Sequence, residues 1–339
     1  MSLAAGFSQF LAPARASRRR AFGDPRFWLL VGACLALLAS FLPLRRAATS
    51  NGVTLLAIVD VTTSMNVRDY QRGGVAISRM DAVKAALRET FSRLPCPARV
   101  GLGIFTERRP FLLFEPIDVC ESFAAVDGAV AALDWRMAWE GDSRIAAGLF
   151  RSIDLAESLD ADLVFFTDGQ EAPPLPAAGG PVFEGDPARS HGVIMGVGGL
   201  QLSPIPKYDD DGREIGFLAM GDVAQENRSG PPPPDAESRE GYNPRNAPFG
   251  AAAAEGNEHL SSLREPYLRT LAKETGLAYA RFTDAASLEA AILSASRPRP
   301  AKQPQDLRPL ALGLALALLV LSYAVPAAAR FLPSLRRSA

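Results

Sequence analysis

The chain contains few of the residues on which many enzymes and nucleic-acid-binding proteins depend. Only two histidines occur among its 339 residues, and they lie far apart at His191 and His259. They are too few and too scattered for a zinc site or a histidine-centred catalytic site. The formal net charge is −1, and no basic patch with interleaved aromatic residues occurs. The sequence therefore gives no reason to expect a nucleic-acid partner.

Cysteine is also scarce, with three residues in the chain. Cys34 lies in an apolar stretch, where we interpret it as a small packing residue. Cys96 and Cys120 flank a predicted β-hairpin with strands at 99–105 and 110–115, and the hairpin register places the two thiols close together. We therefore predict a Cys96–Cys120 disulfide, which an oxidising periplasm would maintain. Two unconnected, half-buried thiols are the alternative.

Two apolar segments, 27–44 and 309–329, frame the rest of the chain. The first has 18 residues without a charge, and neither segment has the polar stripe of a core helix. We therefore predict two transmembrane helices in a bacterial inner membrane. The arginine excess before the first helix places the basic residues 1–26 and the tail 330–339 in the cytoplasm, and the domain between the helices in the periplasm. A cleaved signal peptide is the alternative for the first segment.

The most informative pattern follows the first apolar segment. Residues 55–59 form an apolar run typical of a buried parallel strand, and Asp60, Thr62 and Ser64 follow it at alternate positions. Open α/β sheets bind ligands at the carboxyl ends of their strands. One carboxylate and two hydroxyls at such an end form half of an oxygen cage for a hard divalent cation.

Two downstream positions complete the predicted cage. A second buried-strand pattern at 163–167 ends in Asp168, and Ser143 opens an apolar helix between the two strands. With only two carboxylates among the ligands, the cation keeps an open position or waters, which favours Mg²⁺, with Ca²⁺ or Mn²⁺ as alternatives. Each of these residues alone is equally typical of a helix N-cap, so the metal interpretation depends on the whole set.

The set resembles the metal-ion-dependent adhesion site of the von Willebrand factor A (VWA) family. That pattern is D-x-S-x-S, then a loop threonine before I-x-x-G/A-L, then the aspartate of T-D-G. The matching residues here are Asp60, Thr62, Ser64, Ser143 and Asp168. Thr62 replaces a serine and Ser143 a threonine, and both keep the hydroxyl. The resemblance covers residues 52–296 and implies a protein-binding domain whose metal takes a carboxylate from a partner.

The order of strands and helices within 52–296 predicts an α/β fold. We expect a doubly wound, mostly parallel sheet with one antiparallel edge strand from the hairpin at 99–115. The predicted helices are 79–91, 122–133, 143–159, 267–275 and 285–294, and further strands are 191–199 and 277–282. A hairpin insertion at 203–219 has an Asp-Gly turn, and a proline-rich loop at 225–257 is expected to be disordered. The acidic triplet Asp209–Asp211 lacks the spacing of a calcium loop and is interpreted as a solvated turn.

Enzyme activity is not expected. Thr62 lies where haloacid-dehalogenase phosphatases have a second acid, and no G-x-S-x-G turn surrounds Ser64. One helix on each side of the domain, together with the insertion S-P-I-P…D-D-G-R…G-F-L, resembles the bacterial Bat-type VWA proteins.

Within that group, the overall plan resembles the accessory proteins of methanol oxidation. The resemblance implies a maturation factor for methanol dehydrogenase, acting with other accessory proteins in enzyme assembly and calcium insertion. A Bat-type protein that works with a MoxR-type AAA+ ATPase on other envelope clients is the alternative. A structural scaffold that associates without metal is a third.

Overall fold

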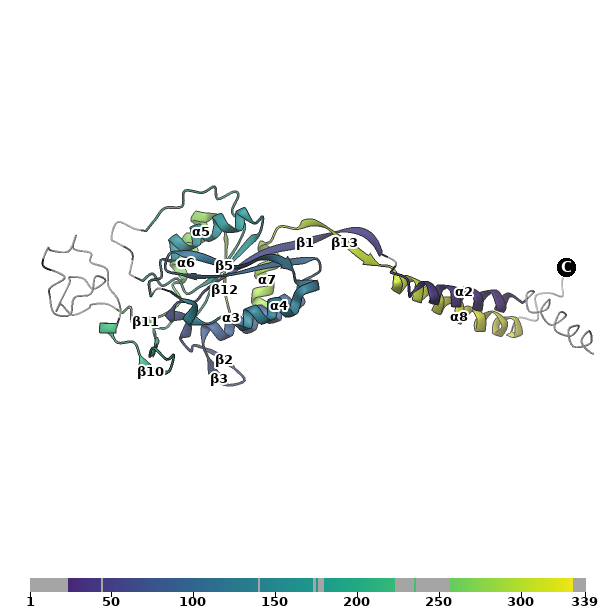
Figure 1. Ribbon diagram of the computed structural model, residues 1–339, viewed down its shortest axis with the longest axis horizontal. Coiled ribbons are helices and arrows are strands. Elements are labelled where there is room, and N and C mark those ends of the chain that lie inside the picture. Colours follow the sequence, from purple (N-terminus) through teal and green to yellow (C-terminus); the bar gives the residue numbers. More distant parts are fainter. Residues whose placement is uncertain are drawn as a thin grey trace, which may run out of the picture. The chain divides into compact units, whose positions relative to one another are not determined.

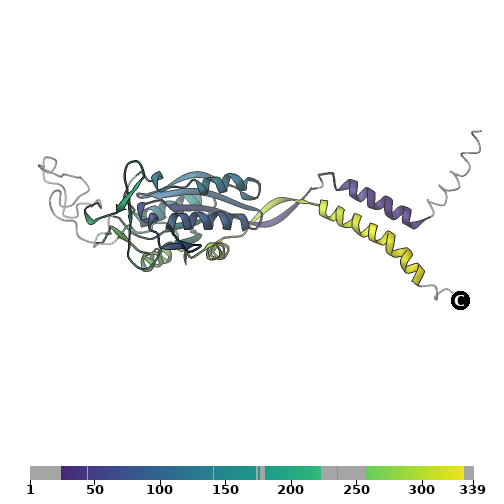
Figure 2. The same ribbon diagram turned by 90° about the horizontal axis from the view of Figure 1, so that it is seen from below.

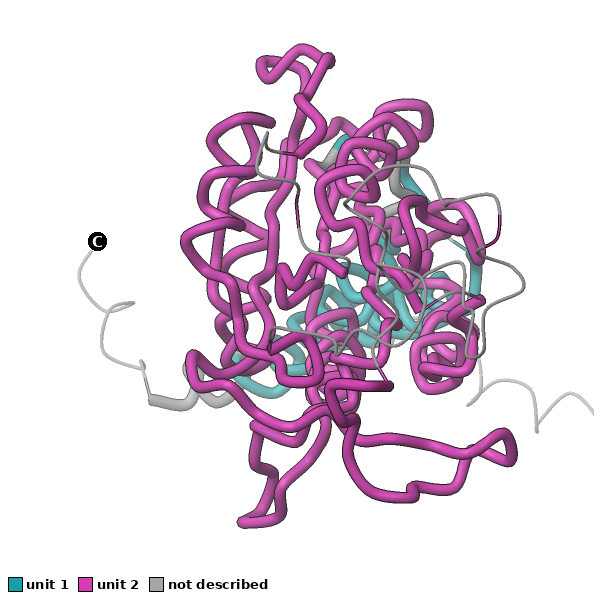
Figure 3. The backbone as a smooth tube through the Cα atoms, turned by 90° about the vertical axis from the view of Figure 1, so that its left-hand side faces the viewer, with its two compact units in different colours: residues 1–50, 302–339 teal, residues 51–301 magenta. Residues whose placement is uncertain are grey.

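The computed structural model describes residues 24–331 except 44, 140, 173–174, 176–179, 223–234 and 236–256. The chain forms two compact units, distinguished by colour in Figure 3. Unit 1 comprises residues 1–50 and 302–339, and unit 2 comprises residues 51–301. The predicted cytoplasmic segments lie mostly outside the described residues, and so does most of the predicted disordered loop.

Unit 1 contains two helices that pack against each other, α2 (Pro25–Ala39) and α8 (Arg308–Phe331). They overlap the two predicted apolar segments, but α2 has 15 residues and is shorter than the predicted span of 18. Among the helices of the described residues, none combines the length and the apolar character needed to cross a membrane. The prediction of two transmembrane helices is therefore not confirmed.

The core of unit 2 is a sheet, whose strands are drawn as arrows in Figure 1. Its strand order is β12-β7-β6-β1-β4-β5. These strands are β1 (Arg45–Asp60), β4 (Ala98–Thr106), β5 (Arg109–Asp118), β6 (Asp162–Thr167), β7 (Gly192–Gly196) and β12 (Ala278–Arg281), and β13 (Arg299–Asp306) also pairs with β1. Along this order, neighbouring strands are parallel except for β5, which runs antiparallel to β4 at the edge. The predicted α/β fold is confirmed.

Helices cover both faces of this sheet (Figures 1 and 2). One face packs against α3 (Arg79–Arg93), α4 (Val119–Ala131) and α7 (Ala285–Ala295), and the other against α5 (Ile145–Ser158) and α6 (Glu265–Thr275). Strand β1 is buried on both sides, since Leu55, Ala57 and Val59 join the first core while Leu56 and Ile58 join the second. A strand between two cores needs apolar residues at every position, which explains its unbroken apolar run.

Short elements surround the carboxyl end of the sheet. The insertion contains the predicted hairpin of β9 (Pro206–Tyr208) and β10 (Glu214–Phe217). Further short elements were not predicted from the sequence. They are the pair β2 (Tyr70–Arg72) and β3 (Val75–Ile77), the pair β8 (Ser203–Pro204) and β11 (Leu260–Ser261), and the 3₁₀ turns η1 (Thr63–Asn66), η2 (Trp135–Met137) and η3 (Met220–Asp222). Helix α4 begins three residues before its predicted start because Asp118 caps it, accepting the N–H of Cys120 at 2.8 Å.

The structure joins Cys96 and Cys120 by a disulfide, with their Cα atoms 6.2 Å apart. Phe105 faces Pro110 across the hairpin, and two irregularities in the β4–β5 register follow toward the cysteines. Under denaturing, non-reducing conditions we expect a thiol reagent to label Cys34 alone, and all three cysteines after reduction. Closing a loop of this length contributes about 3 kcal/mol, so the reduced protein should unfold at lower urea concentration. Labelling of more than one thiol per chain before reduction would contradict the pairing.

Gly148 allows helix α5 to approach strand β4 closely. A Cβ atom at this position would lie 1.9 Å from Cε2 of the fully buried Phe105. Alanine normally stabilises a helix interior by about 1 kcal/mol relative to glycine, but overpacking of a core costs about 1–3 kcal/mol. We therefore predict that Gly148→Ala lowers the free energy of unfolding in urea titrations. The control is Gly128→Ala on α4, where a Cβ meets no atom within 4 Å and alanine should stabilise. Stabilisation by both changes would refute this packing.

Candidate metal centre

The five predicted ligands converge at the carboxyl end of the sheet. Asp60 ends β1 and Asp168 follows β6, and these strands are parallel neighbours in which Val59 faces Phe166. Both carboxylates are completely buried. The three hydroxyl residues line one cavity of about 240 Å³ at the same end. They are Thr62, Ser64 and Ser143. Residues from three separate parts of the chain thus form one oxygen-rich site.

Asp60 is held in one orientation by three hydrogen bonds. Its Oδ1 accepts from the backbone N–H of Thr62 at 2.9 Å and from the Thr62 hydroxyl at 2.7 Å. Its Oδ2 accepts from the hydroxyl of Thr167 at 2.8 Å. The Thr62 and Ser64 hydroxyl oxygens lie 3.4 Å apart. Thr167 was not among the predicted site residues, although the threonine of the T-D-G pattern is the signal that marks it.

Ser143 is held in place by hydrogen bonds of its backbone. Its N–H donates to the carbonyl of Ala172 at 2.7 Å, and the N–H of Ala172 donates back to the Ser143 carbonyl at 2.8 Å. The Ser143 Oγ is buried and has no hydrogen-bond partner among the described residues. Leaving such a group unsatisfied costs about 1–3 kcal/mol. The position of Ser143 Oγ therefore suits an oxygen that binds a cation, either directly or through a water molecule.

The electrostatics of the two acids also fit a cation. Burial, and after it the nearby charge of Asp168, raises the pKa of Asp60 from 3.8 to about 7, against the lowering effect of the Thr62 and Thr167 hydrogen bonds. A bound cation would reverse this penalty because it favours the ionised carboxylate. No group of three or more His, Cys, Asp or Glu side chains in the described residues is arranged to hold a metal. Hydroxyl oxygens would therefore have to supply the rest of the coordination shell.

The insertion forms one wall of the cavity, which the sequence did not predict. Ile205 and Leu218 of this insertion line the cavity, together with Asp222 and Glu258. Gln170 links Asp168 to the segment that contains Glu258. Its backbone N–H donates to Asp168 Oδ1 at 2.9 Å, and its side-chain Nε2 donates to the carbonyl of Glu258 at 3.2 Å. The insertion and the segment around Glu258 therefore contribute to the cavity at the candidate metal centre.

Arg79 is a further site residue that the sequence analysis did not identify. It opens α3 and is completely buried. Its Nη1 donates to Asp168 Oδ2 at 2.9 Å, and its Nη2 donates to Asp69 Oδ2 at 2.7 Å. The apolar pattern of 79–91 does not indicate that Arg79 is buried. Arg79 is the first residue of the helix, a position that is usually exposed to solvent.

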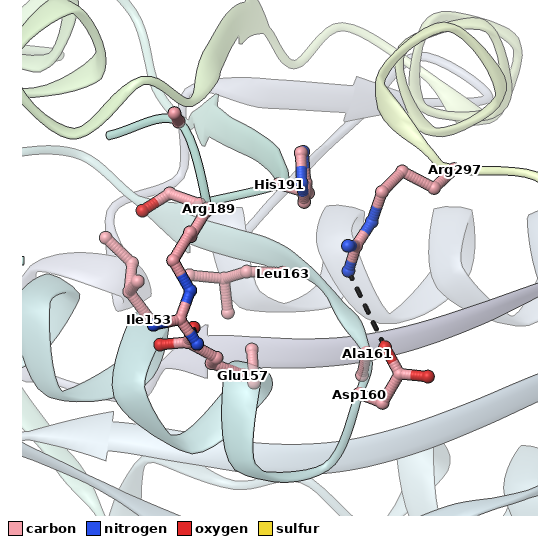
Figure 4. A pocket seen from close by; sticks show the side chains of 11 residues that line it. Ile153, Glu157, Asp160, Ala161, Leu163, Arg189, His191 and Arg297 are labelled. Atoms are coloured by element: carbon pink, nitrogen blue, oxygen red, sulfur yellow. Dashed lines mark ion pairs between the residues drawn. The ribbon is translucent and has the colours of Figure 1, made fainter. Parts of the chain in front are cut away.

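A second cavity, of about 290 Å³, lies at the amino ends of β6 and β7 (Figure 4). The charged side chains that line it pair with one another, Arg297 with Asp160 at 3.8 Å and Arg189 with Glu157. These internal pairs leave the cavity with balanced charge. The candidate functional site is therefore the carboxyl end, where two buried acids and an orphaned hydroxyl occur together.

Similar proteins were found by fold and by domain family. An aerotolerance-related membrane protein from Bacteroides fragilis is 16% identical, with a TM-score of 0.44, and the match covers 72% of this chain and 98% of that one. BatB from Bacteroides thetaiotaomicron is 16% identical, with a TM-score of 0.43, and the match covers 71% and 95% of the two chains. No curated protein matches by sequence. Residues 55–170, which include all five predicted ligands, match the von Willebrand factor type A domain family.

Proposed function

We propose that the VWA domain binds a divalent cation and uses it to bind an acidic side chain of a partner protein. The proposed ligands, directly or through water, are Asp60, Thr62, Ser64, Ser143 and Asp168, and the proposed cation is Mg²⁺, with Ca²⁺ or Mn²⁺ as alternatives. The observation that carries this proposal is the buried Ser143 hydroxyl, which has no described partner and lines the same cavity as Thr62 and Ser64.

The donor set explains why the site would bind a partner. Mg²⁺ prefers six oxygen ligands and readily keeps some of them as water. The chain offers two carboxylates and three hydroxyls, so at least one position remains for an outside ligand. A carboxylate oxygen is the strongest oxygen donor that a protein partner supplies. We propose no catalytic reaction, because the Thr62 hydroxyl donates to Asp60 and no second acid stands in its place.

The partner and the location belong to the proposal as well. The sequence resemblance to Bat-type proteins supports a place at the periplasmic face of the inner membrane and a client in the cell envelope. Methanol dehydrogenase is the client that the methanol-oxidation resemblance favours, and a MoxR-type ATPase is the helper that the Bat-type resemblance favours. A scaffold that associates without metal remains the alternative, and metal dependence of binding separates the two.

A short acidic peptide tests this function without knowledge of the client. We expect a peptide with one glutamate to bind the full-length, Mg²⁺-saturated protein more than tenfold tighter than its glutamine counterpart, a difference of about 1.4 kcal/mol. The binding should disappear in EDTA. Fluorescence anisotropy of labelled peptides measures both effects. Equal binding of the two peptides, or glutamate binding that persists in EDTA, would exclude the proposed mechanism.

A further inference from the structure

The guanidinium of Arg79 lies inside a group of acids at the candidate metal centre. It is completely buried, and it contacts Asp168 on one side and Asp69 on the other. Nη1 also donates to the Ser261 hydroxyl at 2.6 Å. Ser261 in turn donates to the same Asp168 oxygen at 2.7 Å. The Asp168 Oδ2 atom therefore already has two donors before any metal binds.

The surrounding backbone is shaped around this arginine. Gly198 has a φ of +118°, and a Cβ at this position would lie 2.7 Å from Arg79 Cζ. The N–H of Gly199 donates to Asp69 Oδ2 at 2.7 Å, which holds that carboxylate against the guanidinium. A left-handed glycine is needed both for this backbone conformation and for the space that the guanidinium occupies. The surrounding backbone therefore fixes the position of the Arg79 guanidinium within the site.

The charges determine what the arginine does to a metal. The guanidinium pairs with Asp69 and Asp168, and Asp168 also interacts electrostatically with Asp60. Because the interior screens charge weakly, a fixed positive charge beside the centre opposes a divalent cation. It also occupies one oxygen of Asp168. The repulsion and the occupied Asp168 oxygen both reduce the negative charge that this chain offers to a bound cation.

We infer that Arg79 is a resident counter-cation that weakens metal binding and thereby preserves the metal's attraction for a partner's carboxylate. This inference rests on the proposed function. Arg79 acts through Asp168 and through its own charge, so it is a positioning residue. If it only supported the fold, its loss would lower stability and Mg²⁺ affinity together. The inference predicts that the two change in opposite directions.

The first test is a Mg²⁺ titration of the full-length protein by calorimetry. Arg79→Gln should unfold at a lower temperature in EDTA, yet bind Mg²⁺ at least about tenfold tighter because the repulsion is gone. It should also bind the glutamate peptide at least about tenfold more weakly at saturating Mg²⁺. Arg79→Lys keeps the charge and should stay within about threefold of the wild type in Mg²⁺ affinity. Arg88→Gln, which removes an exposed arginine paired with Asp127, is the control.

A second variant keeps the inference testable if Arg79→Gln does not fold. Asp69→Asn removes the other acid that neutralises Arg79, so the guanidinium should oppose the cation more strongly and Mg²⁺ affinity should fall about three- to tenfold. Unchanged affinity in Asp69→Asn, or weaker Mg²⁺ binding in a folded Arg79→Gln, would overturn the inference. Absence of Mg²⁺ binding by the wild type would instead overturn the proposed function itself.

Discussion

Asparagine in place of Asp60 is expected to abolish Mg²⁺ binding and, at the same time, to stabilise the metal-free protein at pH 8. Asp60 is fully buried beside a second acid, and its pKa of about 7 means that it is ionised at pH 8 at a cost to the fold. Asparagine keeps the oxygen that accepts from Thr62, while Thr167 Oγ1 can accept from the new amide. Each pKa unit corresponds to about 1.4 kcal/mol, so the expected gain is roughly 2–4 kcal/mol.

Urea unfolding in EDTA and Mg²⁺ calorimetry measure the two halves of this prediction. Asp210→Asn is the matched control, because Asp210 is an exposed acid at the Asp-Gly turn and its loss should change neither quantity. A variant that keeps Mg²⁺ binding would show that Asp60 is not a ligand. A variant that loses binding and is also less stable in EDTA would show that its carboxylate is structural.

The stabilisation of the protein by Mg²⁺ should depend steeply on pH. Asp60 has a raised pKa, so its contribution to stability is fully present below 3.8 and is lost as the pH rises through about 7. The metal-free protein should therefore lose stability between pH 5.5 and pH 8. Mg²⁺ must displace the Asp60 proton at the lower pH, so its affinity should be roughly thirtyfold weaker at pH 5.5 than at pH 8.

Thermal unfolding with and without Mg²⁺ at the two pH values measures this effect. The increase in melting temperature on adding Mg²⁺ should be large at pH 8 and small at pH 5.5. In Asp60→Asn both the pH dependence and the Mg²⁺ effect should disappear. An equal Mg²⁺ effect at both pH values in the wild type would mean that Asp60 does not exchange a proton for the metal.

The sheet was predictable because its signals are local. Apolar runs at 55–59 and 163–166 mark β1 and β6, since a strand between two helical layers needs apolar residues at every position. Gly276, with a φ of +78°, ends α6 where the sequence placed the stop. The predicted start of α4, at residue 122, was three residues too late. The helix begins at Val119 because Asp118 caps it through a side-chain hydrogen bond, which the apolar pattern does not indicate.

The candidate site was only partly predictable. Its five oxygen residues follow strand ends or open a helix, and both positions leave a pattern in the sequence. Arg79 leaves none, since its burial results from Asp69, Asp168 and Gly198 meeting in three dimensions. The contribution of the insertion to the cavity was also not predicted. The sequence indicates the hairpin, but it does not indicate which part of the domain the hairpin packs against. The apolar composition of the two segments predicted helices long enough to span a membrane. Composition does not show where a helix begins and ends, and α2 is limited to 15 residues by its caps at Asp24 and Ser40.

The most direct test of the metal centre is a Mg²⁺ titration of the full-length protein by calorimetry, with Asp168→Ala alongside. We expect one saturable Mg²⁺ site per chain in the wild type and none in Asp168→Ala, while both proteins unfold cooperatively. Asp168 is the informative position because its carboxylate is completely buried at the end of the strand beside β1. Saturable binding that survives in Asp168→Ala, or no binding in the wild type, would rule out the proposed metal centre.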